Sequence, residues 1–196
     1  MFAALLDTCV LWPSLQRDLV LSLAAEGLYR PLWSSAVLDE LEESETRKLV
    51  GRGRAPTEAA AASRRLVTRM AEAFDGACVT GWEPLEGAFG LPDPDDEHLV
   101  AAAVVGGAGA IVTSNVRDLP VGRVPGHVQV RSPPDFVLET VEIDPEAASR
   151  AVLTIAARYR DPPRGADEVL DLLGSRYGMA AAAARIRAAA PAGARA

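Results

Sequence analysis

Acidic side chains stand at widely separated points of this sequence, in places where a fold can gather them. Asp7 directly follows the apolar run 2–6, and Asp118 comes shortly after another apolar run. Asp93 and Asp96 lie between these two points, at the predicted start of a helix. An acid that ends a buried apolar strand is costly to desolvate without a partner, so Asp7 in particular is predicted to be functional.

The chemistry that such acids support is the binding of a hard cation. Carboxylates a few ångströms apart repel and raise each other's pKa unless a cation lies among them. Oxygen ligands favour Mg²⁺, Mn²⁺ or Ca²⁺ over zinc. Zinc is also disfavoured because the chain has two histidines and two cysteines, and Cys9 and Cys78 lack zinc-ligand spacing. Magnesium held by carboxylates often bridges a phosphate, so phosphodiester hydrolysis is the natural reaction.

Several acids also have a structural interpretation that stays open. Glu42 and Glu43 are interpreted as solvated charges on a helix, whereas Glu40 suits a site and an exposed helix face about equally. Asp93 is interpreted first as a helix cap and second as a ligand, because an Asp followed by Pro94 is a favourable helix start.

The elements that must position these acids alternate between strand and helix. Short apolar runs predict strands, and capped amphipathic segments predict the helices between them. The predicted strands cover 2–6, 31–33, 77–80, 110–113 and 128–131. The predicted helices run from after Pro13 to Gly27, from a cap at Ser34 or Ser35, from a cap at Thr57 to about Phe74, and over 99–105. This alternation is the signature of a parallel sheet with helices on both faces.

In an open parallel sheet, ligands bind beyond the carboxyl ends of the strands. Asp7 is at the carboxyl end of the first predicted strand, and Asn115 and Asp118 follow the fourth. The loops and helix starts at this edge are therefore expected to bring the carboxylates together.

The pattern changes from Asp144 onward. Helical segments are predicted over roughly 145–159, 165–173 and 179–189, with breaks at 161–163 and at Gly174 and Gly178. The alanine-rich end is expected to stay helical until Pro191. Residues 1–139 are thus predicted to form the catalytic domain, and 140–196 a helical C-terminal extension.

Composition and charge narrow the function classes. The chain has 196 residues, 49% hydrophobic and 24% charged, which is typical of one globular domain with a small appendage. Its net charge of −7 argues against a protein that coats nucleic acid through its overall field, but a metal-dependent nuclease carries acids of its own. Two cysteines and the lack of an apolar run of signal-peptide or membrane-span length predict a cytoplasmic protein.

Basic residues are concentrated between positions 47 and 69, where seven arginines and lysines stand against one acid, Glu58. A solvated surface and a phosphate-binding rim are both open interpretations of this cluster. Arg65 and Arg69 are four residues apart and share a helix face, with Arg64 beside them. These three are the candidate phosphate contacts.

Three segments resemble the motifs of PIN-domain ribonucleases. LLDTCVLWP resembles the opening of that family, and SSAVLDELEE resembles the segment that supplies its second acid, here Glu40. DPDDEHLVAAAVVGGAGAIVTSNVRDLP resembles the third and fourth motifs. The match spans roughly 1–137, and the last block together with the opening is quite specific. Cys9 stands where asparagine is usual, and Asn115 where many members have aspartate.

The resemblance implies a fold and a site. The fold is a three-layer α/β/α arrangement around a parallel sheet of four or five strands, and the extension resembles that of a longer subgroup. The implied catalytic residues are Asp7, Glu40, Asp96 and Asp118, of which Asp7, Asp96 and Asp118 hold Mg²⁺ or Mn²⁺, with Asp93, Thr113 and Asn115 in support. Either Asn115 or Asp118 is expected to face the metal.

The resemblance also implies partners. A VapC-type toxin of a type II toxin–antitoxin pair cuts RNA and binds a cognate antitoxin protein, with homodimerisation left open and no membrane association expected. The arginines Arg64, Arg65 and Arg69 then become the expected RNA contacts.

Other readings of Asp7 fit less well. A phosphotransfer receiver needs a lysine near the end of the sheet, and Lys48, the one lysine, lies on a predicted helix. A haloacid-dehalogenase phosphatase needs a second aspartate where Cys9 stands. A P-loop or dinucleotide enzyme needs glycines that open a helix, whereas 106–109 end one. A non-catalytic binding module built on the PIN fold remains the alternative.

Overall fold

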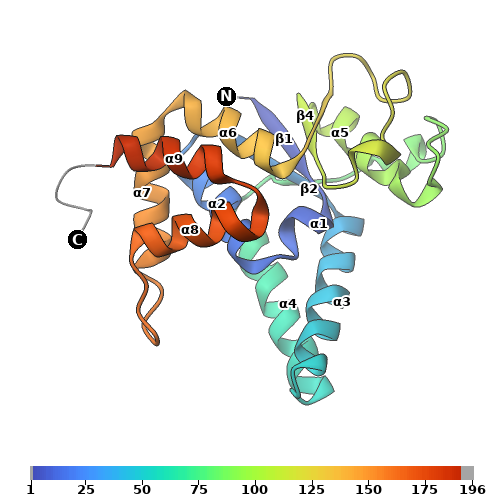
Figure 1. Ribbon diagram of the computed structural model, residues 1–196. Helices are drawn as coiled ribbons and strands as arrows, with labels where there is room; N and C mark the ends of the chain where they lie inside the picture. Colours follow the sequence, from blue (N-terminus) through green and yellow to red (C-terminus); the bar gives the residue numbers. More distant parts are fainter. Residues whose placement is uncertain (1, 191–196) are drawn as a thin grey trace. The chain divides into compact units, whose positions relative to one another are not determined.

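The computed structural model describes residues 2–190, which divide into two compact units (Figure 1). The first, here called the sheet unit, comprises residues 2–12 and 31–131. The second, here called the helical unit, comprises residues 13–30 and the described residues from 132 onward. No helix within residues 2–190 is both long enough and apolar enough to cross a bilayer.

The sheet unit is built on a five-stranded parallel sheet, which confirms the predicted fold class. The strands are β1 (Ala3–Leu6), β2 (Arg30–Ser34), β3 (Cys78–Val79), β4 (Ala110–Val112) and β5 (Gln129–Arg131). Their order is β3-β2-β1-β4-β5, and Leu5 of β1 lies opposite Ile111 of β4. Both of these side chains are fully buried, as expected for the central strands of a parallel sheet.

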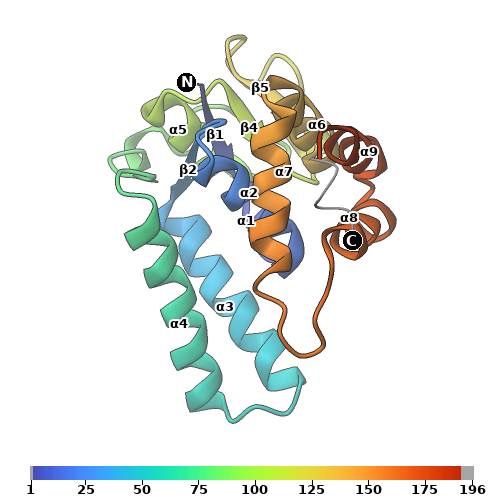
Figure 2. The same cartoon turned by 90° about the vertical axis from the view of Figure 1, so that its left-hand side faces the viewer.

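Two long helices of the sheet unit form an antiparallel hairpin, α3 (Ser35–Gly51) and α4 (Pro56–Ala73), which projects from the sheet (Figures 1 and 2). Ser34 caps α3 as predicted, because its Oγ accepts a hydrogen bond from the Val37 N–H at 3.1 Å. The cap predicted at Thr57 is wrong. Helix α4 instead begins at Pro56. Proline suits the first helical position because its φ is already close to the helical value and because the N–H that it lacks would have no partner within the helix there.

Two shorter helices of the sheet unit adjoin the strand ends. Helix α1 (Thr8–Leu11), which was not predicted, follows β1 directly. Helix α5 (Glu97–Gly106) follows a 3₁₀ turn, Pro94–Asp96, that Asp93 caps by accepting the Asp95 N–H. Gly107 ends α5 with φ of 65°, which a side chain would disfavour.

The helical unit consists of α2 (Ser14–Ala25), α6 (Pro133–Ile143), α7 (Pro145–Ala156), α8 (Ala166–Tyr177) and α9 (Ala180–Ala189). Helix α6 is absent from the predicted helices. It is capped by Ser132, whose Oγ accepts the Asp135 N–H at 3.3 Å, and its two prolines occupy the first turn, where they are tolerated. Its Phe136 ring packs edge-on against Tyr29, with centroids 4.9 Å apart.

The predicted break at Gly174 is also wrong, because α8 continues through it to Tyr177. A Cβ at Gly174 would lie at an ordinary van der Waals distance, 3.4 Å, from the Cα of Ala180, so α8 packs against the start of α9 at this position. Gly178 does end α8, with φ of 71°. The expected fraying after Pro191 lies outside the described residues, and the domain boundary at 139/140 stays a prediction.

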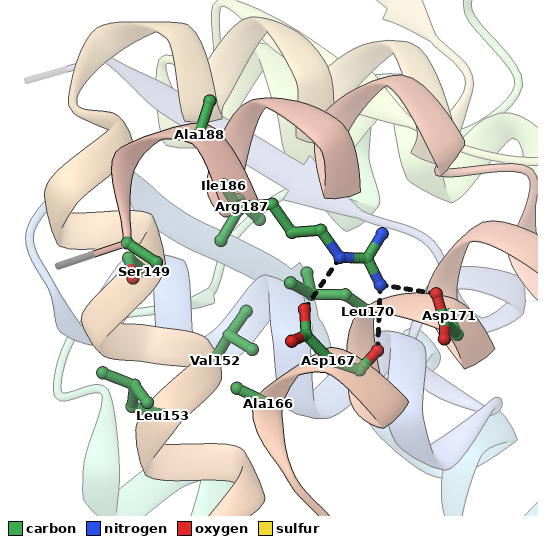
Figure 3. Close-up of a pocket in the computed structure, with 11 residues that line it drawn as sticks. Ser149, Val152, Leu153, Ala166, Asp167, Leu170, Asp171, Ile186, Arg187 and Ala188 are labelled. Atoms are coloured by element: carbon green, nitrogen blue, oxygen red, sulfur yellow. Dashed lines mark hydrogen bonds and ion pairs between the residues drawn. The ribbon is translucent and has the colours of Figure 1, made fainter. Parts of the chain in front are cut away.

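A cavity of about 510 Å³ lies between α7, α8 and α9 of the helical unit (Figure 3). On its wall, Arg187 of α9 forms ion pairs with Asp167 and Asp171 of α8. Val152, Leu170 and Ile186 contribute apolar surface. Every residue that lines this cavity belongs to the helical unit, whereas the acids predicted to be catalytic all belong to the sheet unit.

Candidate metal centre

Asp7 is held in a fixed orientation at the carboxyl end of β1. Its carboxylate Oδ2 accepts a hydrogen bond from Thr113 Oγ1 at 2.6 Å and lies 2.9 Å from the Cys9 thiol. Its backbone N–H donates to the Val112 carbonyl, and Oδ1 accepts the Cys9 N–H at the start of α1. Only 8% of Asp7 is exposed. The ends of β1 and β4 thus fix this acid, and Thr113 supports it.

The Cys9 thiol serves as a hydrogen-bond donor at this point. Burial, the charge of Asp7 and the hydrogen bond to Asp7 raise the pKa of Cys9 to about 11, so the thiol stays protonated at neutral pH. Its Sγ also accepts the N–H of Ser114 at 3.1 Å. Cys9 therefore connects the residues after β1 with those after β4.

Asp96 lies among other carboxylates. Burial raises its pKa, as do the charges of Asp7, Asp93 and Asp118, so that the pKa reaches about 6, while His98 opposes the shift. Burial is the largest cause of this shift, and the three charges add to it because they lie near enough to act on Asp96. The structure therefore brings together acids from three separate segments: the end of β1, the start of α5 and the residues after β4.

Glu40 joins the same region through two hydrogen-bonding neighbours. Its Oε2 accepts a hydrogen bond from Thr8 Oγ1 at 2.6 Å, and its Oε1 lies 3.4 Å from His98 Nε2. The other ring nitrogen of His98 lies 3.2 Å from Ser34 Oγ. The hydrogen bond with His98 lowers the pKa of Glu40, with help from Thr8 and against the effect of burial. Glu40 is therefore ionised at neutral pH.

Comparison with known proteins gives the family of this arrangement. The PIN domain profile matches residues 3–117, more than half of the chain. The chain belongs to the PIN-domain family. The VapC50 C-terminal domain matches residues 133–188, which confirms the expected VapC-type PIN protein with a C-terminal helical extension. The receiver, phosphatase and P-loop alternatives are set aside by these matches.

One curated relative is "Putative ribonuclease VapC50" of Mycobacterium tuberculosis. It is 35% identical over 91 residues, which are 46% of this chain and 54% of the relative. The chain therefore spans about half the length of this relative. No solved structure gives a significant match.

A buried acid of the PIN domain, Glu97, was not among the predicted functional residues. Its carboxylate accepts the N–H groups of Leu91 at 2.8 Å and of Phe89 at 3.1 Å. Burial acts to raise the pKa of Glu97, but these backbone hydrogen bonds and those of Gly90 and Gly87 outweigh it and lower the pKa. Through these hydrogen bonds, Glu97 holds the loop 87–91 against the start of α5, where Asp96 is the preceding residue.

The remaining predicted residues of the PIN domain lie as follows. The Asn115 N–H donates to Thr113 Oγ1 at 2.9 Å, and the Asp118 N–H donates to the Asn115 carbonyl at 3.0 Å. Of these two, Asp118 is the one whose charge acts on Asp96. Arg65 and Arg69 are exposed on α4, where Arg64 pairs with Glu42 at 3.4 Å.

The acids of the PIN domain fit a hard divalent cation by their chemistry. Within residues 2–190, no three Asp, Glu, His or Cys side chains converge in the geometry of a formed metal site. The donors are nevertheless all oxygens, and Asp7, Asp93 and Asp118 together raise the pKa of Asp96. A cation among them would relieve that repulsion, and oxygen donors select Mg²⁺ or Mn²⁺.

The raised pKa of Asp96 should be measurable, in the absence of metal, as a lower free energy of unfolding at neutral pH. Because its folded-state pKa of about 6 lies above the ordinary 3.8, the wild type loses stability as pH rises through this interval. Asp96→Asn removes the repelling charge. Discounted for partial exposure, the variant should gain roughly 1 kcal/mol, or about 2–4 °C in Tm, at about pH 7, and almost nothing at about pH 4.

Thermal unfolding in EDTA at the two pH values measures this gain. Asp95→Asn, an exposed neighbour on the same turn, is the matched control and should show no comparable gain. An Asp96→Asn variant that is no more stable than the wild type at neutral pH would contradict the crowding of these acids.

Proposed function

We propose that this protein is a Mg²⁺- or Mn²⁺-dependent endoribonuclease and the toxin of a type II toxin–antitoxin system. The observation that carries the proposal is the position of Asp96, whose carboxylate lies within electrostatic reach of Asp7 and Asp118 at the ends of β1 and β4. Membership of the PIN-domain family and likeness to a relative named as a ribonuclease support it.

The acids have different roles in this proposal. Asp7, Asp96 and Asp118 hold the cation, which when bound supplies positive charge for the phosphate and activates water. Glu40, ionised and hydrogen-bonded to Thr8, is the fourth catalytic acid and would add negative charge beside the cation. Thr113 orients Asp7. Asn115 supports the backbone after β4, and Asp93 supports the turn that precedes α5.

The substrate and partner follow from the same proposal. RNA supplies the phosphodiester bond, and Arg64, Arg65 and Arg69 on α4 offer a basic surface for its backbone or for the acidic arm of an antitoxin. A cognate antitoxin protein would silence the enzyme by binding to it.

Removal of the metal is the direct test of this function. Cleavage of total RNA should occur with Mg²⁺ or Mn²⁺, stop in EDTA and return when either ion is restored in excess. Product analysis on gels measures it, and the Asp7→Asn variant controls for contaminating nucleases. Cleavage that persists in EDTA and is absent from the Asp7→Asn preparation would indicate a metal-free mechanism. RNA binding without cleavage under any ion would instead support a non-catalytic PIN-fold module.

A further inference from the structure

The segment that comprises the loop after β4 and strand β5 has a local excess of positive charge. Residues 114–131 contain Arg117, Arg123 and Arg131 but a single acid, Asp118. This contrasts with the whole chain, whose net charge is −7. Because the overall field repels a polyanion, a nucleic acid strand needs a local basic surface of this kind to approach the protein.

The same loop is hollowed into a groove. Its volume is about 1070 Å³, and it is lined by residues 116–117, 119–126 and 128–131. This volume lies slightly above the range for small-molecule pockets, about 300–1,000 Å³, which suits a segment of a chain better than a compact metabolite. Arg117, Arg123 and Arg131 all belong to its lining.

Buried side chains and hydrogen-bonded turns hold the backbone around the groove in place. The side chains of Leu119, Val124 and Val128 are buried and anchor the loop to the PIN domain. Tight turns stiffen the loop, since the Arg123 N–H donates to the Pro120 carbonyl at 3.1 Å and the Val128 N–H to that of Pro125 at 2.9 Å. The arginines are therefore presented by a fixed backbone.

Two connections link the lining of the groove to segments that carry the predicted metal ligands. Asp118 stands in the chain between Arg117 and Leu119, both of which line the groove. The guanidinium of Arg123 lies against Gly90, with Nη1 3.1 Å from the point where a Cβ would be. Gly90 belongs to the loop that the buried Glu97 fastens beside Asp96. A strand in this groove would thus lie next to the carboxylates.

We propose that this groove binds the phosphate backbone of an RNA strand and leads it to the acidic centre. The inference rests on the proposed ribonuclease function and names a substrate-binding surface for it. Arg117 and Arg123 are exposed, and a guanidinium can donate two parallel hydrogen bonds to one phosphate. The residues that line the groove include no Phe, Tyr, Trp or His on which bases could stack, so contacts go mainly to the backbone, which carries no sequence information.

The test compares two double variants by RNA affinity against salt. The groove variant is Arg117→Ala/Arg123→Ala, and the matched control is Arg176→Ala/Arg185→Ala, which removes two exposed arginines from the helical unit. The probe is a short fluorescein-labelled single-stranded RNA, with Ca²⁺ present to suppress turnover. The groove variant should bind roughly 10–100-fold more weakly, with a salt slope lower by about 1.4 units, while the control stays close to the wild type.

Two further readouts separate the ways in which this inference can fail. The rise in Tm caused by Mg²⁺ should be equal in the groove variant and the wild type, which shows an intact acidic centre. Salt lines that coincide for the groove variant and the wild type would overturn the groove but leave the proposed function standing. A wild type that neither binds nor cuts RNA would overturn both. Binding of poly-glutamate to the same variants is the second readout. If the groove variant loses poly-glutamate binding but still binds RNA like the wild type, the groove belongs to an acidic protein segment and the proposal is overturned.

Discussion

Replacing Asp7 or Asp96 with asparagine is expected to reduce Mg²⁺-dependent RNA cleavage more than about a hundred-fold. Residues that merely support a metal ligand are typically worth 10–100-fold, and these two acids are proposed as ligands themselves. Asparagine keeps the size of the side chain but removes one negative charge from the cation. Initial rates on a labelled RNA, together with the rise in Tm caused by Mg²⁺, measure the effect, and both readouts should be lost together.

Asp95→Asn provides the matched control for this prediction. Asp95 is exposed and stands next to Asp96 on the same 3₁₀ turn, but it is not among the charges that act on Asp96. Its variant should cleave RNA within about twofold of the wild type. Full cleavage by both Asp7→Asn and Asp96→Asn would refute the metal centre, and equal losses in all three variants would point to damage of the turn.

Glu97→Ala should be the most destabilising single change near the site. Glu97 is 3% exposed, and its removal leaves the N–H groups of Phe89 and Leu91 without their acceptor. Two hydrogen bonds to a buried charged group are worth about 3 kcal/mol together, which corresponds to a loss of roughly 6–12 °C in Tm. Cleavage should also fall, because the loop 87–91 and the start of α5 lose their connection beside Asp96.

The pH dependence gives this prediction a second check. Since the folded-state pKa of Glu97 lies below its usual 4.5, its contribution is present at neutral pH and lost as pH falls through the folded pKa. The difference in Tm between wild type and variant should shrink accordingly. Glu86→Ala, an exposed acid outside the loop, is the control. An unchanged Tm for Glu97→Ala would show that the loop is held by other contacts.

The sequence predicted the sheet because strands depend on local patterns, whereas the metal site that the acids were expected to form stays a prediction. Five short apolar runs became the five strands, with β3 shortened to two residues. The strand ends then determined where Asp7 and Asp118 lie, since the carboxyl ends of parallel strands meet at one edge. The roles of the individual acids stay predictions, because charge proximity does not by itself assign a ligand.

What could not be predicted depends on contacts between distant segments. Glu97 reads as an ordinary acid in the first turn of a helix, and only the fold shows the loop that it fastens. No structural role was predicted for His98, although it joins Glu40 to Ser34. The break expected at Gly174 failed for the same reason, because α8 continues through this position, where it packs against Ala180 of another helix.

The position of β1 in the sheet has a consequence for the order in which the protein is made. Of the five strands of this sheet, β1 leaves the ribosome before the others, yet it lies between β2 and β4. Asp7 and its hydrogen-bonding partner Thr113 are 106 residues apart in the chain. A growing polypeptide therefore holds Asp7 without its counterpart until β4 has been synthesised, and contacts so distant in sequence form slowly. For the proposed ribonuclease, the active site is thus incomplete during most of its translation. The ribosome that synthesises the chain is not exposed to an assembled active site during that time.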